Sequence, residues 1–138
     1  IDTAQSYKGV HALISSNKYR NKFKIISKLN LQKKSTQNNF ESQISNILNE
    51  LKVKKLYGLL IHNPEQIIKK DNYKKIWANI DQIKKKNNVK KIGVSVYSPD
   101  DLLNIINNYK IDIVQFPLNI FDQRFLDYKI IKILRKKK

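Results

Sequence analysis

The sequence predicts an α/β fold in which a parallel sheet is built from repeated strand–helix units. Short apolar runs alternate four times with longer stretches in which apolar residues recur at helical spacing. A polar residue stands at the end of one apolar run after another. Repeated strand–helix units favour parallel strands joined by right-handed crossovers, and either a doubly wound sheet or a barrel satisfies this pattern.

The first half of the chain contains two of these units. Residues 1–2 read as the stub of an earlier strand, and residues 23–29 predict a short strand. Residues 39–52 predict an amphipathic helix, because the apolar residues recur every three to four positions. Residues 57–62 form a near-continuous apolar run, as expected of a strand buried on both faces, and Asn63-Pro64 ends it.

The third unit begins with a helix that Asp71 or Asn72 is expected to cap. Its apolar residues lie on one side of the helix, and we expect Trp77 among them to pack between helix and sheet. Residues 91–96 then predict the next strand.

A strong helix start follows, with Ser98 at the N-cap position and Pro99 in the first helical position. Residues 112–116 predict the fourth strand, closed by Pro117. A last helix is expected from about Arg124 into the basic tail.

The composition is that of one globular domain over residues 1–138, with 41 % hydrophobic and 28 % charged residues. The chain has no cysteine, which excludes disulfides and thiolate metal sites, and no metal site is predicted. No stretch approaches the roughly 18 apolar residues that cross a bilayer. We expect a cytoplasmic protein without a membrane partner.

A net charge of +17 raises the question of a nucleic-acid or anionic-membrane partner. The lysines are spread from Lys8 to Lys138, and no RNA-binding aromatic motif accompanies them. The densest runs, 84–86 and 135–138, fall at the ends of predicted helices, where cations interact favourably with the helix dipole. We therefore predict lysines on solvated helix faces and no nucleic-acid partner.

Five polar residues stand at the ends of successive predicted strands: Asp2, Lys28, His62, Ser95 and Gln115. In a barrel they would converge on the C-terminal face of the sheet, where active sites of this architecture lie. Each residue alone has an ordinary structural interpretation, but five in succession indicate a site. The phosphate-binding glycine loops GxGxxG and GxxxxGK[ST] of doubly wound folds are absent.

The segments around these residues resemble the aldo-keto reductases. Residues 2–7 are similar to the family's Asp-Thr-Ala-x-x-Tyr segment, and residues 26–28 resemble the strand that ends in its catalytic lysine. Residues 59–64 resemble its Leu-Leu-x-His-x-Pro segment, and residues 92–95 its Ile-Gly-Val-Ser segment. Gln115 falls where the family's next strand carries a glutamine.

The resemblance implies an incomplete (β/α) TIM barrel, about half to two-thirds of one, as a single partial domain over residues 1–138. The family's first strand would precede Ile1. Its last two strands, with basic residues for the cofactor's adenosine phosphate, would follow Lys138. We therefore expect the isolated 138 residues not to form an active, well-behaved monomer.

The resemblance also implies a reductase of aldehydes, ketones or sugar-like carbonyls that uses NADPH, with NADH as a possible alternative. Tyr7 would donate the proton, although a phenol ordinarily ionises only near about pH 10. Lys28 would supply a positive charge that makes the phenol a better acid, and Asp2 would hold Lys28 in place. His62 would orient the carbonyl oxygen of the substrate.

Ser95 and Gln115 would hydrogen-bond the nicotinamide amide of the cofactor. Val96 departs from the family, because many members have an asparagine there, and one cofactor contact is thereby lost. The alternative function is a barrel-derived binding or regulatory protein that does not turn over, and a basic nucleic-acid-binding domain is a third. The sequence determines neither the particular substrate nor the oligomeric state.

Overall fold

The computed structural model describes residues 1–31, 37–64, 68, 73–85 and 88–136. Its centre is a sheet of four parallel strands: β1 (Ile26–Leu29), β2 (Leu56–Ile61), β3 (Val89–Ser95) and β4 (Ile113–Gln115). The strands lie side by side in chain order. This order is that of a barrel wall, since a doubly wound sheet reverses its strand order part-way along. The predicted α/β fold is confirmed, and an incomplete barrel fits it.

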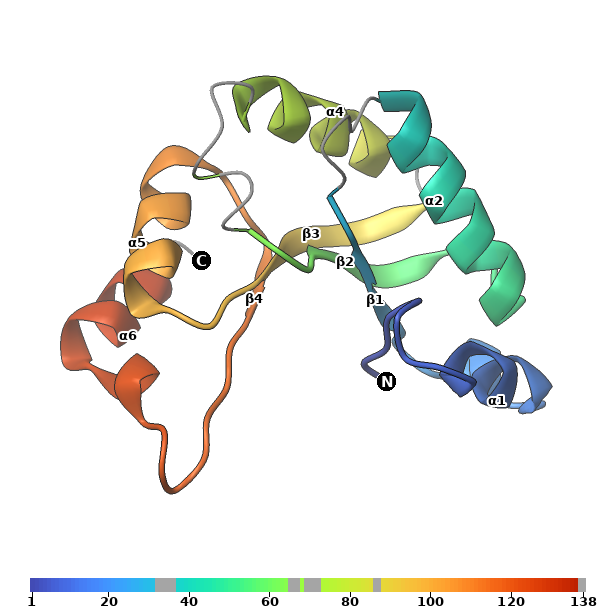
Figure 1. Ribbon diagram of the computed structural model, residues 1–138, viewed down its shortest axis with the longest axis horizontal. Helices are drawn as coiled ribbons and strands as arrows, with labels where there is room; N and C mark the ends of the chain where they lie inside the picture. The colour runs from blue at the N-terminus through green and yellow to red at the C-terminus, as the bar shows by residue number, and fades with distance from the viewer. Residues whose placement is uncertain (32–36, 65–67, 69–72, 86–87, 137–138) are drawn as a thin grey trace.

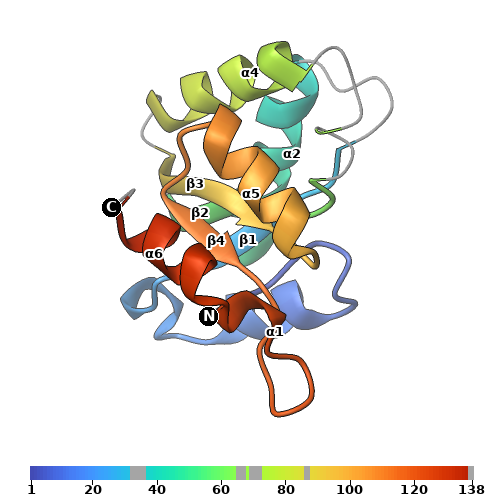
Figure 2. The same cartoon turned by 90° about the vertical axis from the view of Figure 1, so that its left-hand side faces the viewer.

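Helices follow the strands and pack along one side of the sheet, where α2, α4 and α5 form an outer layer (Figures 1 and 2). None of the helices in the described ranges is long and apolar enough to cross a membrane. The helices are α1 (Val10–Ser16), α2 (Gln37–Leu51), α4 (Tyr73–Lys85), α5 (Pro99–Asn108) and α6 (Tyr128–Lys136), with short 3-10 turns at Arg20–Lys22 and Arg124–Leu126.

The hydrophobic core lies between this helical layer and the sheet. Phe40 and Ile47 of α2 are fully buried against it. Trp77 of α4 is 8 % exposed, and its ring lies 4.9 Å from that of Tyr109 after α5. The predicted helix–sheet position of Trp77 is confirmed.

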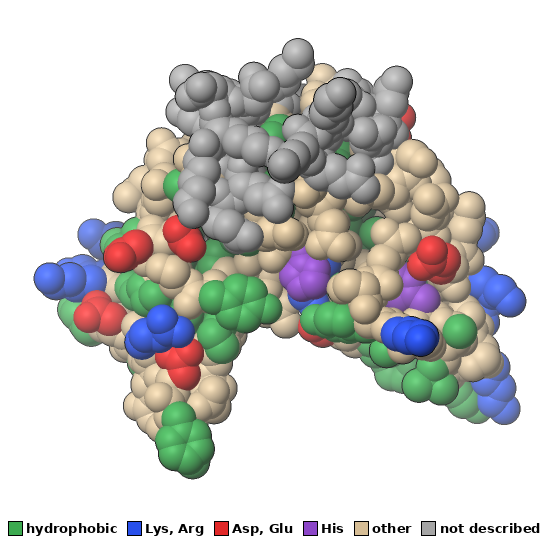
Figure 3. All heavy atoms as spheres, viewed as in Figure 1, with side chains coloured by type: hydrophobic (Ala, Val, Ile, Leu, Met, Phe, Trp, Pro, Cys, Tyr) green, Lys and Arg blue, Asp and Glu red, His purple; other side chains and the backbone are tan. Residues whose placement is uncertain are grey.

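The opposite face of the sheet is concave and corresponds to a barrel interior: the surface is hollowed between the segments around α1 and α6 (Figures 1 and 3). A Cβ atom built on Gly58 of β2 would lie 3.0 Å from the Ile113 side chain and 3.2 Å from that of Ile26. Side chains of β1 and β4 therefore lie together over Gly58 on this face. Because side chains alternate along a strand, Lys28 and Gln115 lie on the same face as Ile26 and Ile113.

Two predicted boundaries differ from the structure by three residues or more. The first strand begins at Ile26 rather than Phe23: the backbone of Phe23 is extended, but it directly follows the 3-10 turn and its side chain is 49 % exposed. The last helix begins at Tyr128 rather than Arg124. Asp127 has extended dihedrals (φ −50°, ψ 131°), and its carboxylate accepts the backbone N–H of Lys129 at 2.7 Å, which caps α6.

The helix predicted after Ser98 is present, with Pro99 in its first turn, but the Ser98 side chain makes no capping hydrogen bond. The cap predicted at Asp71 or Asn72 lies outside the described residues. The basic runs lie as predicted where the structure describes them, because α4 ends at Lys85 and Arg135 and Lys136 form the last turn of α6.

The start of β4 is held to β3 by Asp112. Its carboxylate accepts two hydrogen bonds from Lys84 Nζ, of 2.6 and 2.8 Å, and one of 2.9 Å from the backbone N–H of Ile92. Burial alone would raise the pKa of Asp112, but the bonds from Lys84 and Ile92 outweigh it and lower that pKa below its usual value. This contact stabilises the fold at neutral pH, and its contribution is lost as the pH falls through the lowered pKa.

Gly93 of β3 lies against the backbone of β4, and this gives a stability prediction. A Cβ atom at Gly93 would lie 1.7 Å from the backbone carbonyl oxygen of Ile113. Gly93→Ala should therefore push β4 away and lower the free energy of unfolding by about 1–3 kcal/mol, measured by urea denaturation. Gly58→Ala is the control, because its Cβ would meet only flexible isoleucine side chains. Equal losses in both variants would contradict this account.

Candidate active site

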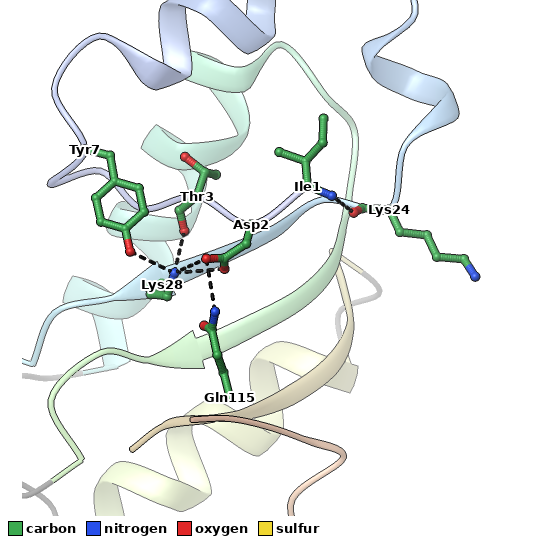
Figure 4. Close-up of polar contacts among 7 residues, drawn as sticks. All are labelled: Ile1, Asp2, Thr3, Tyr7, Lys24, Lys28 and Gln115. Carbon is green, nitrogen blue, oxygen red and sulfur yellow. Dashed lines mark hydrogen bonds and ion pairs between the residues drawn. The ribbon is translucent and has the colours of Figure 1, made fainter. Parts of the chain in front are cut away.

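Lys28, near the end of β1, is the centre of a polar cluster on the concave face (Figure 4). The residue is 3 % exposed, so its ammonium group is shielded from water. Its Nζ donates to both carboxylate oxygens of Asp2 at 2.8 Å, to the Tyr7 hydroxyl at 3.2 Å and to the Thr3 carbonyl at 3.4 Å. A buried ammonium group needs a counter-charge, and Asp2 supplies it.

Asp2 reaches Lys28 because residues 1–3 run parallel to β1. Asp2 forms a bridge with Ile26, whose N–H donates to the Ile1 carbonyl at 2.8 Å and whose carbonyl accepts the Thr3 N–H at 2.9 Å. The stub predicted at residues 1–2 is therefore present as a short piece of strand beside β1.

Tyr7 lies in a turn between this stub and α1. Its N–H donates to the Ala4 carbonyl at 3.0 Å, and its carbonyl accepts the Val10 N–H at 3.1 Å. The residue is 40 % exposed, while its hydroxyl faces Lys28. Tyr7 is thus both accessible and in contact with a buried cation.

His62 comes directly after β2, and its N–H extends the strand ladder by donating to the Leu29 carbonyl at 2.8 Å. Its ring centroid lies 6.3 Å from that of Tyr7 with the planes at 85°. His62 therefore lines the same small region as the phenol, edge to face.

Gln115 and Ser95 lie on the same face as Lys28 but belong to β4 and β3, at the opposite end of the strand order. They are partners in the β3–β4 register, and Gln115 donates from Nε2 to Asp2 Oδ2 at 3.1 Å. Ser95 is 5 % exposed and joins the cluster through this register rather than by a side-chain contact with the other predicted residues. The structure thus brings five of the six predicted residues into one connected group.

The arrangement is suited to moving a proton at the Tyr7 hydroxyl. A positive charge at hydrogen-bond distance favours the negative charge that remains on the phenol oxygen once its proton leaves. The ring of His62, beside that of Tyr7, is a second polar group in the same region. Within the described ranges, no three His, Cys, Asp or Glu side chains gather closely enough to hold a metal ion.

The family model of the aldo/keto reductase family matches residues 1–138. The chain belongs to this family. Among curated proteins, no sequence matches it. This aldo/keto reductase family chain shares its fold with solved aldo-keto reductases.

Three solved structures illustrate the likeness, and each matches 99 % of this chain. A thermostable aldo-keto reductase, in complex with the inhibitor epalrestat, has a TM-score of 0.76 at 22 % sequence identity, and the match covers 51 % of that reductase's chain. An aldo-keto reductase of the silkworm Bombyx mori has a TM-score of 0.71 at 19 % identity and is 45 % covered. One from Klebsiella pneumoniae, in complex with NADPH, has a TM-score of 0.70 at 15 % identity and is 49 % covered. The chain thus spans about half the length of these reductases.

The concave face offers one specific feature that fits a nicotinamide cofactor. Gln115 Oε1 is buried and has no partner among the described residues. A buried acceptor without a donor is costly, and the N–H₂ group of a carboxamide would satisfy it. Val96 is completely buried in the hydrophobic core, so it offers no polar contact to a cofactor.

A groove of about 850 Å³ at the start of β4, lined by Tyr109, Ile113 and Leu134 among others, includes none of the predicted site residues. We place the site at Lys28 because the polar groups converge there.

A second polar group lies beside Tyr7 and was not predicted from the sequence. Gln5 and His11 both contact Glu50 near the end of α2, and all three line a hollow of about 360 Å³ together with Tyr7. Each of these residues lies outside the predicted strand ends, and the helical spacing of residues 39–52 assigns Glu50 only to a polar helix face. No signal in the sequence pairs it with His11.

Proposed function

We propose that the intact protein is an NADPH-dependent reductase of aldehydes, ketones or sugar-like carbonyls, with Tyr7 as the proton donor. The observation that carries this proposal is the contact of one buried ammonium group, Lys28 Nζ, with both the Asp2 carboxylate and the Tyr7 hydroxyl. Membership of the aldo/keto reductase family supports the class of reaction.

NADPH, when bound, would supply the hydride that the carbonyl carbon needs. The Tyr7 hydroxyl donates its proton to the carbonyl oxygen, and Lys28 stabilises the negative charge left on the phenol. Asp2 holds the Lys28 ammonium in place through two hydrogen bonds. His62, beside the Tyr7 ring, orients the substrate oxygen toward the hydroxyl.

Gln115 and Ser95 would hold the nicotinamide amide. The unpartnered Gln115 Oε1 would accept an amide N–H, while its Nε2 stays bonded to Asp2. Reductases from Klebsiella pneumoniae with the same fold were crystallised with NADPH and with NADP, which supports a nicotinamide cofactor. NADH remains the alternative that a direct comparison of the two cofactors would decide.

Oxidation of NADPH at 340 nm by the intact protein, with a panel of simple aldehydes, ketones and sugars, tests this function. We expect turnover that depends on both NADPH and the carbonyl compound. Tight NADPH binding without turnover on any of these compounds would instead favour the alternative, a barrel-derived binding or regulatory protein.

A separate prediction concerns the net charge of +17. We expect the affinity for mixed-sequence DNA to be non-specific and to fall steeply with salt, because dispersed lysines contact phosphates but not bases. Electrophoretic mobility shifts at increasing salt measure this. A tight, sequence-selective complex at about physiological ionic strength would contradict the prediction and favour a nucleic-acid-binding domain.

A further inference from the structure

Glu50 connects both sides of the turn that carries Tyr7. Its Oε1 accepts a hydrogen bond of 3.2 Å from Nε2 of Gln5, a residue two positions before Tyr7. Its Oε2 lies 2.6 Å from Nδ1 of His11, a residue four positions after Tyr7. Glu50 itself belongs to the last turn of α2, a helix packed against the core. One carboxylate on a fixed element therefore holds the turn at two points.

The contact with His11 is the stronger of the two. A carboxylate oxygen only accepts hydrogen bonds, so His11 Nδ1 carries the proton. The His11 side chain is 9 % exposed, whereas that of Glu50 is 48 % exposed. An exposed ion pair contributes little to the free energy of folding. A buried N–H donor without an acceptor is unfavourable, however, because it has lost its hydrogen bonds to water and gained none in return. The Glu50 contact is therefore expected to persist in solution.

Among the described residues, the backbone hydrogen bonds of Tyr7 are both local, to Ala4 and Val10, and the residue is 40 % exposed. Gly9, the residue before α1, has a positive φ of 78° and allows the chain to reverse between Tyr7 and His11. The distance of 3.2 Å from the Tyr7 hydroxyl to Lys28 Nζ thus depends on how the turn is anchored to α2.

We propose that Glu50 is a positioning residue for the reaction, acting through Gln5 and His11 to hold the Tyr7 hydroxyl against Lys28. This inference rests on the proposed function, because it assigns Glu50 to the placement of the proton donor. Glu50 touches neither the reacting atoms nor the residues assigned to the cofactor. Its loss should therefore lower kcat and leave the KM for NADPH unchanged.

Three variants of the intact protein test the proposal, with Ser15→Ala as the matched control. Glu50→Ala removes both contacts. His11→Leu removes one donor. His11→Asn keeps an N–H close to the position of Nδ1, so its kcat and exchange rates should be close to those of the wild type. Ser15 lines the same hollow, and among the described residues its hydroxyl donates to the Ala12 carbonyl alone, so loss of the hydroxyl should change neither readout.

Two readouts are needed. Hydrogen exchange of the Tyr7 and Val10 amides should become about tenfold faster in Glu50→Ala, as expected when a hydrogen bond to a charged group is lost. Steady-state kinetics should show kcat lower by about 10- to 100-fold, the cost of a slightly misplaced reacting group. Recovery in His11→Asn but not in His11→Leu would support the role of the hydrogen bond.

The two proposals fail in different ways. If the wild-type protein shows no reductase turnover, the proposed function is wrong. The hydrogen-exchange rates then still test whether Glu50 anchors the turn that carries Tyr7. Unchanged exchange in Glu50→Ala would overturn the inference whether or not the protein is a reductase. Faster exchange with an unchanged kcat would overturn it as well, because the contact would then be structural only.

Discussion

Replacing Tyr7 by phenylalanine is expected to lower carbonyl reduction by the intact protein by about 10²–10⁴-fold, the usual contribution of a positioned general acid. The substitution removes only the hydroxyl that lies 3.2 Å from Lys28 Nζ. The ring and its edge contact with His62 remain, so the fold and the cofactor site should be unaffected.

Steady-state kinetics with a simple aldehyde and a fluorescence titration with NADPH measure the two quantities separately. Tyr128→Phe is the control, because Tyr128 is 74 % exposed on α6 and lies outside the polar cluster. Undiminished turnover in Tyr7→Phe would remove Tyr7 from the mechanism, and an equal loss in the control would point to a general effect on the protein.

The second large effect is expected for Lys28→Met, which keeps most of the side-chain volume and removes the charge. We expect turnover to fall by about 10²–10³-fold, as when a single preorganised electrostatic contact is removed from an active site. The Asp2 carboxylate would lose its cation but keep the hydrogen bond from Gln115, and it is 40 % exposed to water. The variant should therefore still fold.

Lys90→Met is the matched control, since Lys90 is an exposed lysine of β3 whose loss changes the net charge equally. Circular dichroism of both variants separates a loss of catalysis from a loss of structure. A Lys28→Met protein that is folded, binds NADPH and reduces aldehydes at the wild-type rate would show that the phenol needs no neighbouring cation.

The positions of the strands were predictable because they depend on local patterns. The apolar run at 57–62 matches β2 to within one residue, since a strand buried on both faces admits few polar residues. The convergence of Lys28, His62 and Gln115 followed from a general rule, because the carboxyl ends of parallel strands share one edge of the sheet.

The parts that were not predictable depend on contacts between distant segments. Phe23 belongs to an apolar run, but its N–H donates to the Arg20 carbonyl of the preceding 3-10 turn, and propensity alone does not reveal that. The break before α6 depends on a single residue, Asp127, whose carboxylate caps the next turn. The pairing of His11 with Glu50 requires α1 and α2 to be adjacent, which no local pattern encodes.

The hydrogen bond from Gln115 to Asp2 joins residues 113 positions apart. Synthesis proceeds from the N-terminus, so Asp2 and Lys28 leave the ribosome long before Gln115 does. The polar cluster is therefore completed only when β4 docks, at the cost in folding rate that such distant contacts carry. A nascent chain interrupted before β4 would expose the pair of Lys28 and Asp2 without the Gln115 amide. It would also leave the edge of β3 unpaired, and quality-control proteases could attack the chain there.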